Sequence, residues 1–281
     1  MPKVAAVFVL YNPSEEFIYN LNSVRKQVDW VYIIDNSENV NESVIRKIKL
    51  LENIEYLFNK SNIGIAAAIN KAAELAIENN FEFILTMDQD SFIEENYINK
   101  MLQILSVKGK IGLLAPLVVH ILNPKEPTTR SLERITVAMT SGCLVRLSAY
   151  KFINGFLEKL FIDYVDNEFC LRLKKSGYEV YRLNSVKLYH NLGDIKPKKI
   201  LFWKVFPTYH SPLRLYYRTR NRLFVYKNYK SIYAKYILQD FILFIKEYIK
   251  ILLFEDRKYE KTKMIIRGFT DYRKNKFGKF E

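Results

Sequence analysis

Cysteine is scarce in this sequence. Its 281 residues include only two cysteines, Cys143 and Cys170, which both stand in apolar stretches. Neither belongs to a spacing that binds zinc or an iron–sulfur cluster. Dense cysteines are typical of small secreted domains, so this composition instead favours a reduced, cytoplasmic compartment.

Glycine-rich phosphate-binding loops are also missing. The nine glycines form no GxGxxG and no GxxxxGK[ST] pattern, which excludes the usual dinucleotide-binding and P-loop cradles. The longest apolar region, residues 233–261, is interrupted by charged side chains and falls short of the ~20 predominantly apolar residues that a membrane-spanning helix needs. We therefore expect a folded protein without a spanning helix in this region.

The excess of positive charge is confined to the last third of the chain. Residues 1–195 carry 22 Lys and Arg against 23 Asp and Glu, whereas residues 196–281 carry 22 against 7. We therefore predict two parts, a catalytic domain over 1–195 and a helical, basic, aromatic-rich region over 196–281. A basic and aromatic surface indicates a polyanionic partner, either nucleic acid or an anionic membrane.

The first part alternates segments typical of strands and helices. Apolar, β-branched runs over 4–10, 30–37, 54–60 and 81–90 predict strands, and amphipathic segments over 14–27, 41–52 and 62–79 predict helices between them. This order predicts an α/β fold with a mostly parallel central sheet flanked by helices. Ligands of such sheets bind beyond the carboxyl ends of the strands.

Each of these predicted strands ends in polar residues, which include Tyr11, Asn12, Asp35 and the pair Asp88 and Asp90. Two carboxylates this close repel each other unless a cation or a solvated turn lies between them. Oxygen ligands of this kind suit Mg²⁺ or Mn²⁺, which then bridges substrate phosphates. The alternative for an isolated Asp-x-Asp is a turn or helix cap; the neighbouring polar strand ends favour the metal.

Three further polar residues are candidates for chemistry. Asp166 and Glu168 stand at the start of a predicted helix, where the dipole favours carboxylates, and fit either a general base with its partner or capping acids paired with Arg172. His190 follows an apolar run and is a metal ligand only if the fold brings it near Asp90. His120 and His210 lack such a context.

Several motifs together resemble glycosyltransferase family 2 with the GT-A fold, and within it the rhamnosyltransferase-like branch. The matching segments are VAAVFVLYNP, IIDNSE, NIGIAAAINKA, TMDQDS, SGCLVR, FIDYVDNEFCLRLKKSGY, YHNLGD and YYRTRN. They span residues 4 to 222 in the family's order.

The resemblance implies roles for individual residues. It implies that Asp166 is the catalytic base, with Asp163 as the alternative and with Glu168 and Arg172 as support. The residues implied for the nucleotide are Tyr11, Asn12, Asp35, Asn62, Gly64, Asn70 and Asp88. The implied metal ligands are Asp90, Asp88 and His190, and the acceptor-side candidates are Ser141, Gly142, Tyr216 and Arg220. The family often has Glu-Asp-x-Asp where this sequence has Val165-Asp166-Asn167-Glu168.

The implied activity is inverting transfer of a sugar from a nucleotide-sugar donor, dTDP- or UDP-linked, to a growing surface polysaccharide on a lipid-linked carrier. The branch indicates L-rhamnose from dTDP-rhamnose, and galactosyl, glucosyl and galactofuranosyl transfer are the alternatives. A nucleotidyltransferase would need a Gly-rich, basic N-terminal loop that LYNPSEEF lacks. Nucleic-acid binding is disfavoured because the basic residues of the C-terminal region are interleaved with long aliphatic runs.

The segment YAKYILQDFILFIKEYIKILLFEDRKYEK reads as an amphipathic helix with basic flanks. Such helices lie in the interface of anionic membranes, which would place the enzyme at the inner face of the cell membrane. The same apolar face could instead pack on protein, either on the catalytic domain or on a second copy in a homodimer.

Overall fold

The computed structural model describes residues 2–120, 130–190, 198–200, 203–205 and 209–281. The chain forms two compact units, one made of Met1–Glu158 and Val165–Asn191 and the other of Lys159–Tyr164 and Leu192–Glu281. The domain boundary predicted between residues 195 and 196 lies outside the described residues. The six residues Lys159–Tyr164 interrupt the first unit in sequence and group with the second.

The first unit contains a mixed sheet with strand order β3-β2-β1-β4-β8-β6-β9-β5, in which β7 also pairs with β9. Its first half is parallel, as predicted, and consists of β1 (Val4–Leu10), β2 (Trp30–Asp35), β3 (Ile54–Phe58) and β4 (Phe83–Asp88). The register places Leu10 beside Asp35 and Val9 beside Asp88. The carboxyl ends of three strands therefore meet at one edge.

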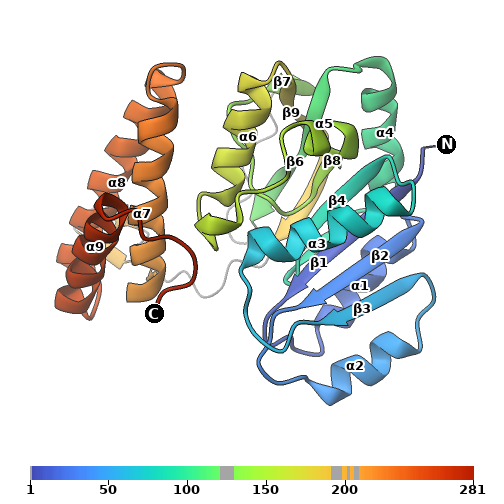
Figure 1. The fold of residues 1–281 in the computed structure, drawn as a ribbon, viewed down its shortest axis with the longest axis horizontal. Coiled ribbons are helices and arrows are strands. Elements are labelled where there is room, and N and C mark those ends of the chain that lie inside the picture. Colours follow the sequence, from blue (N-terminus) through green and yellow to red (C-terminus); the bar gives the residue numbers. More distant parts are fainter. Residues whose placement is uncertain (1, 121–129, 191–197, 201–202, 206–208) are drawn as a thin grey trace. The chain divides into compact units, whose positions relative to one another are not determined.

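Helices cover both faces of this parallel half (Figure 1). Alternate residues of β1, namely Val4, Ala6, Phe8 and Leu10, pack in one core cluster with residues of α1 (Phe17–Arg25), α2 (Glu42–Lys49) and α4 (Tyr97–Val107). The Ala-rich helix α3 (Ile65–Glu78) packs on β1 and β2 from the other face. Two-sided cover explains why these strands read as continuous apolar runs.

The second half of the sheet mixes strand directions. It contains β5 (Ser91–Ile93), β6 (Ile111–His120), β7 (Leu132–Arg134), β8 (Cys143–Arg146) and β9 (Glu179–His190), together with helices α5 (Leu147–Phe152) and α6 (Val165–Lys175). Strand β8 runs antiparallel to β4 and β6, and β9 runs parallel to β6. Residues 179–194 read as two short strands in the sequence, but 179–190 form one strand with a register shift opposite Pro116 and Leu117.

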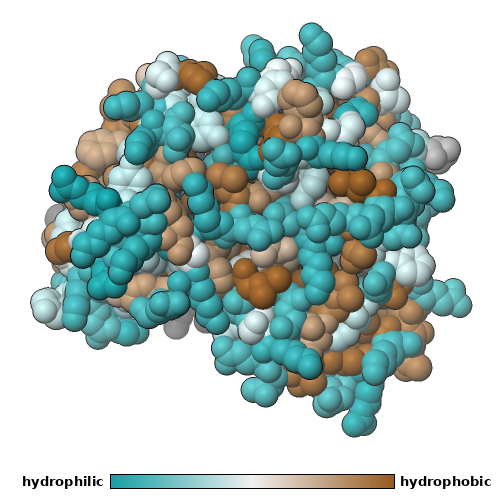
Figure 2. Space-filling model, in the orientation of Figure 1, coloured by the Kyte–Doolittle hydropathy of each residue, from teal (hydrophilic) through white to brown (hydrophobic). Residues whose placement is uncertain are grey.

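The second unit consists mainly of helices α7 (Pro212–Tyr229), α8 (Ala234–Phe254) and α9 (Lys258–Arg273), with a short hairpin of β10 (Lys198–Ile200) and β11 (Trp203–Val205). Ser211 caps α7 by accepting a hydrogen bond from the backbone of Arg214, and Pro212 fits the first helical turn. Only Ile251 of α8 is buried, and apolar side chains reach the surface among hydrophilic ones over these helices (Figure 2). Among the described residues, no helix combines the length and apolar character that crossing a bilayer requires.

Candidate active site

Hydrogen bonds tie the polar strand ends of the first unit together. The backbone N–H of Tyr11 donates to Oε1 of Gln89 at 2.9 Å, and that of Asn12 donates to Oγ of Ser37 at 2.7 Å. Nδ2 of Asn36 donates to the carbonyl of Gly64 at 3.2 Å. The ends of β1, β2 and β4 and the start of α3 thus form one polar surface at the edge where ligands of such sheets bind.

Residues 62–64, predicted as the start of a helix, instead form a turn before α3 that has the geometry of a ligand-binding loop. Oδ1 of Asn62 accepts from the backbone N–H of Gly64 at 2.9 Å. Gly64 has φ 89° and immediately precedes the helix, a conformation that favours glycine and lets a ligand approach the backbone. Gly64 thereby lies at the positive end of a helix dipole, which suits an anionic group.

Asp35 is buried at the end of β2. Its Oδ2 accepts from the hydroxyl of Tyr56 at 2.7 Å, and its Oδ1 accepts from the backbone N–H of Ser37 at 2.8 Å. Burial and the hydrogen bond to Asp35 raise the pKa of Tyr56, so the phenol remains a donor at neutral pH. A carboxylate accepts about four hydrogen bonds, so Asp35 retains capacity for a nucleobase N–H.

Asp88, Asp90 and His190 form an acidic cluster with metal-binding chemistry. One potential ligand atom from each residue lies within 4.8 Å of the other two. Nδ1 of His190 lies 3.4 Å from Oδ1 of Asp90. Two carboxylates and an imidazole form a ligand set that suits Mn²⁺. Mg²⁺, which prefers oxygen ligands, is suited by the two carboxylates. The residues present therefore fit a divalent cation.

Two serines outside the predicted set of metal ligands support this cluster. Oγ of Ser91 lies 2.7 Å from Nδ1 of His190, and Oγ of Ser141 donates to Ser91 at 3.1 Å. Ser141 also accepts from the backbone N–H of Asp88 at 3.0 Å. A hydrogen bond to one ring nitrogen fixes the tautomer and orientation of a metal-binding histidine. Ser141, predicted on the acceptor side, is fully buried and holds the acidic turn.

Gly142 sits where no side chain fits. Its φ is +77°, and a Cβ there would lie 2.8 Å from the hydroxyl of Tyr97 and 2.9 Å from Cγ of Pro116. The same hydroxyl donates to the carbonyl of Gly142 at 2.6 Å. The absence of a side chain at Gly142 therefore lets the buried turn between Thr140 and β8 pack closely against Tyr97 and Pro116.

Asp166 lies in the first turn of α6 and lines a small internal cavity. Thr86 of β4, Thr140 and Cys143 line the same cavity. Burial raises the pKa of the Cys143 thiol well above its usual value, and Cys170 and then the carboxylates of Asp166 and Asp88 raise it further. The fold thus brings the candidate base close to β4, the strand that ends in Asp88.

Glu168 and Arg172 brace the segment before α6. Their side chains form a bidentate pair with both distances 2.9 Å, and Glu168 is buried. Arg172 also donates to the carbonyls of Ile153 and Gly155. The pair therefore orders residues 153–155, and its expected role as catalytic support stays a prediction.

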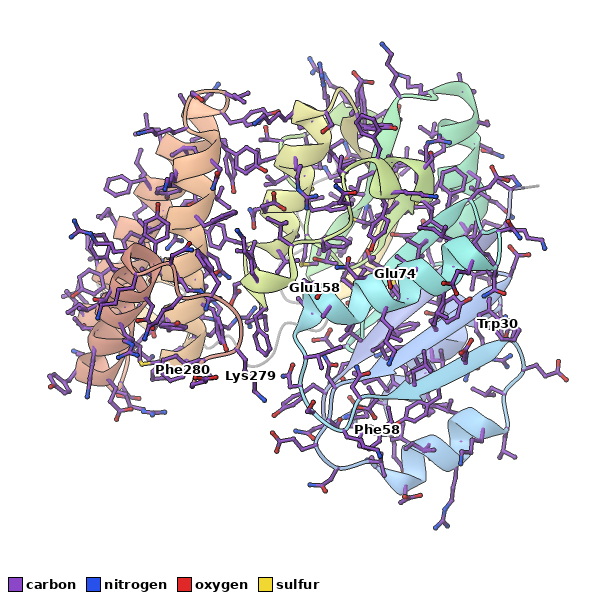
Figure 3. All side chains as sticks on the ribbon, viewed as in Figure 1. Trp30, Phe58, Glu74, Glu158, Lys279 and Phe280 are labelled. Atoms are coloured by element: carbon purple, nitrogen blue, oxygen red, sulfur yellow. The ribbon has the colours of Figure 1, made fainter. Side chains whose placement is uncertain are left out.

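Asn70 is saturated by protein partners. Its Oδ1 accepts from the hydroxyl of Tyr150 at 2.7 Å and from the backbone of Phe156 at 2.9 Å. Its Nδ2 donates to the carbonyl of Phe156 and to Glu158, both at 2.9 Å, and Glu158 lies beside α3 in Figure 3. These contacts anchor residues 156–158, whereas a direct contact with nucleotide would require Asn70 to exchange one of them.

The remaining predicted residues belong to the helical unit. Asp163 pairs with Arg214 at 3.3 Å and with Arg218 at 3.7 Å. Tyr216 and Arg220 are buried among residues of the same unit. Burial raises the pKa of Asp163 and these two guanidinium groups oppose that rise, so the carboxylate is engaged as an ion-pair partner.

Comparison with known proteins shows to which family this arrangement of residues belongs. The pattern of the family described as Glycosyl transferase family 2 matches residues 6–175, which covers most of β1, the chain through β8, the acidic turn and α6 with Asp166, and ends before β9. The chain belongs to glycosyltransferase family 2. It is 29% identical over 239 residues, 78% of each chain, to the dTDP-rhamnosyl transferase RfbF of Shigella flexneri. The chain described here is therefore a glycosyltransferase that uses a nucleotide-sugar donor.

Solved structures share the fold of this glycosyltransferase. A structure of GalNAc-T7 with UDP, GalNAc and Mn²⁺ aligns with a TM-score of 0.63 at 13% identity, covering 98% of this chain and 56% of that one. S. aureus TarS 1–349 in complex with UDP-GlcNAc aligns at 0.57 and 15% identity, covering 97% of this chain and 73% of that one. The family 2 chain thus spans little more than half of the GalNAc-T7 structure, and these likenesses concern the fold.

Proposed function

We propose that this glycosyltransferase moves L-rhamnose from dTDP-rhamnose, with inversion, onto a glycan that is carried on a lipid-linked diphosphate. The similarity to a dTDP-rhamnosyl transferase over 78% of both chains carries the choice of donor. The convergence of the nucleotide edge, the acidic cluster and Asp166 supports the chemistry.

The donor nucleotide lies at the carboxyl edge of the parallel strands. Asp35, fixed by Tyr56 and Ser37, accepts a base N–H, and Tyr11 and Asn12 flank it at the end of β1. The turn at Asn62 and Gly64 presents backbone N–H groups at the start of α3. Asn70 does not contact the nucleotide directly and instead anchors residues 156–158.

Asp88, Asp90 and His190 hold a divalent cation, Mg²⁺ or Mn²⁺. When bound, such an ion neutralises charge on the diphosphate leaving group. Ser91 orients His190, and Ser141 holds the backbone of Asp88 in place.

Asp166 removes the proton from the acceptor hydroxyl, whose oxygen then attacks the anomeric carbon from the face opposite the nucleotide. Asp166 lies in the first turn of α6, where the helix dipole interacts favourably with a negatively charged side chain. We assign the base to Asp166 in preference to Asp163, whose carboxylate is paired with two arginines.

The helical unit binds an anionic membrane surface, at the inner face of the cell membrane, where lipid-linked acceptors are found. Exposed apolar residues line α8, including Leu238, Leu243 and Leu253, and the region carries a net positive charge. Apolar burial and attraction to anionic lipids act together on such a helix.

A screen of nucleotide sugars tests the assignment. The protein is incubated with dTDP-rhamnose and with UDP-linked galactose, glucose and galactofuranose, with and without Mn²⁺, and nucleoside diphosphate release is measured. We expect release from dTDP-rhamnose that depends on the cation and is lost in Asp166→Asn, while nucleotide affinity stays within about twofold. If only a UDP-sugar released nucleoside diphosphate, that sugar would replace dTDP-rhamnose as the assigned donor. Full turnover by Asp166→Asn would refute the assignment of Asp166 as the base.

A further inference from the structure

The six residues Lys159–Tyr164, which we term the strap, lead directly into the helix that carries Asp166. Tyr164 is joined by its peptide bond to Val165, the first residue of α6. The strap itself groups with the helical unit. The contacts that hold the strap therefore act on the residue that directly precedes α6.

Three of the six strap residues adopt left-handed backbone angles without being glycine. Phe161 has φ 66°, Asp163 has φ 59° and Tyr164 has φ 63°. This conformation is unfavourable for residues with a Cβ and persists only where the surroundings over-determine it. The strap must therefore be held by specific contacts.

Asn221 of α7 supplies the central contact. Its Nδ2 donates to the carbonyls of Leu160 at 2.8 Å, Ile162 at 2.8 Å and Asp163 at 2.9 Å, and its side chain is fully buried. Nε of Arg220 donates to Oδ1 of Asn221 at 3.0 Å. Because a guanidinium cannot accept, this bond orients the amide so that its NH₂ faces the strap.

The side chains of the strap are held by the same helix. The ring of Phe161 stacks on Tyr217 with centroids 5.2 Å apart. Arg214 pairs with Asp163 at 3.3 Å, and Nε of Arg222 donates to the hydroxyl of Tyr164 at 2.6 Å. Each left-handed residue of the strap thus has its own partner on α7.

We propose that Asn221 is a positioning residue for Asp166, and that the YYRTRN segment serves to hold the strap rather than to contact the acceptor. This inference rests on the proposed role of Asp166 as base. By fixing three strap carbonyls, Asn221 holds the backbone that continues directly into the first turn of α6, where Asp166 lies. A displacement of about 1 Å at a reacting group lowers the rate about 100-fold.

The test compares Asn221→Ala with Asn228→Ala in the full-length protein. Asn228 lies on the same helix, is exposed, and donates only within α7 to the carbonyl of Phe224 among the contacts of its side chain that the structure describes. Transfer from the donor that the nucleotide-sugar screen selects is measured at saturating acceptor. The stoichiometry and affinity of nucleoside diphosphate binding are measured by calorimetry.

We expect Asn221→Ala to lower kcat about 10- to 100-fold per nucleotide-binding site, with the donor KM within about twofold, and Asn228→Ala to match the wild type. Counting binding sites separates misplacement of the base from partial unfolding, since unfolding would remove binding sites in proportion to activity. Wild-type kcat per site in Asn221→Ala would overturn the inference.

A second variant covers the case in which Asn221→Ala does not fold. Arg214 has a half-exposed side chain, so Arg214→Gln removes the ion pair with Asp163 without leaving a buried cavity. We expect kcat per site to fall about three- to tenfold with donor KM unchanged. Unchanged kcat in Arg214→Gln, alongside an inactive Asp166→Asn, would refute the positioning role and leave the proposed function standing; an active Asp166→Asn would instead refute the function itself.

Discussion

Nδ1 of His190 lies 3.4 Å from Oδ1 of Asp90, although the two residues are far apart in sequence. They meet because β5 pairs antiparallel with β9, which places Ser91 directly opposite His190. Ser91 forms a hydrogen bond with the imidazole, so the strand pairing places both the histidine and the side chain that orients it beside Asp90.

We predict that Asp90→Asn lowers transfer about 100-fold and removes the dependence on Mn²⁺, because an amide is a weaker and uncharged ligand. Calorimetric titration of nucleoside diphosphate with and without Mn²⁺ measures the effect. Asp256→Asn, at an exposed position in the helical unit, serves as the matched control. Retention of metal-dependent binding in Asp90→Asn would contradict the assignment.

Ser91→Ala should lower the affinity for Mn²⁺ about tenfold without abolishing activity, since it removes the partner of His190 and leaves all three ligands in place. The concentration of Mn²⁺ that gives half-maximal activity measures the change. An unchanged concentration would show that Ser91 does not act through the metal site.

Asp35→Ala should raise the donor KM about tenfold or more with a much smaller change in kcat, because a hydrogen bond to a buried carboxylate contributes to ground-state binding. Tyr56→Phe, which removes only the donor to Asp35, should move KM less. Initial rates over a range of donor concentrations distinguish the two variants. A fall in kcat at constant KM would place Asp35 in the chemical step instead.

His210 makes stability depend on pH. Burial, assisted by Arg218 and Arg214, lowers the pKa of its imidazole to about 4. The unfolded chain therefore binds the proton more readily between pH 6.5 and 4, so this contribution to stability is complete above about pH 6.5 and is lost as pH falls toward 4. The charged groups that act on it lie in the helical unit and are Arg214, Arg218, Glu247, Glu255 and Lys261.

Thermal melts at pH 7, 6, 5 and 4 measure this dependence. We expect His210→Gln to lose less stability than the wild type between pH 6.5 and 4, because glutamine does not take up a proton. Identical slopes for both proteins would exclude His210 as a contributor.

The double substitution Leu243→Ser and Leu253→Ser should weaken binding to vesicles that contain anionic lipid about tenfold, since both side chains are exposed on α8. Leu50→Ser with Val107→Ser, at apolar positions on the first unit that are even more exposed, should leave co-sedimentation unchanged. Equal binding by both proteins, with a dimer in solution lost only in the α8 variant, would show that this face packs on a second copy.

The sequence by itself determined the parallel half of the sheet and the residues at its edge. Strands β1, β2 and β4 are buried on both faces and β3 is partly buried at the edge of the sheet, so their apolar runs and polar ends can be recognised from the local sequence. Asp88 ends one such strand and Asp90 lies in the turn after it, and the family pattern over residues 6–175 covers them.

Only the tertiary structure decided which distant groups support those residues. Tyr56 belongs to no motif, and the motifs that contain Ser91 and Ser141 did not indicate a part in the metal site. The contacts of all three come from strand pairing and from buried hydrogen bonds between segments far apart in sequence. The strap is the clearest case: six residues within the first unit's sequence are held by Asn221, about sixty positions later. Hydrogen bonds of this kind, from a side chain to a distant backbone carbonyl, depend on the tertiary arrangement of the chain. No local pattern of hydrophobicity encodes that arrangement.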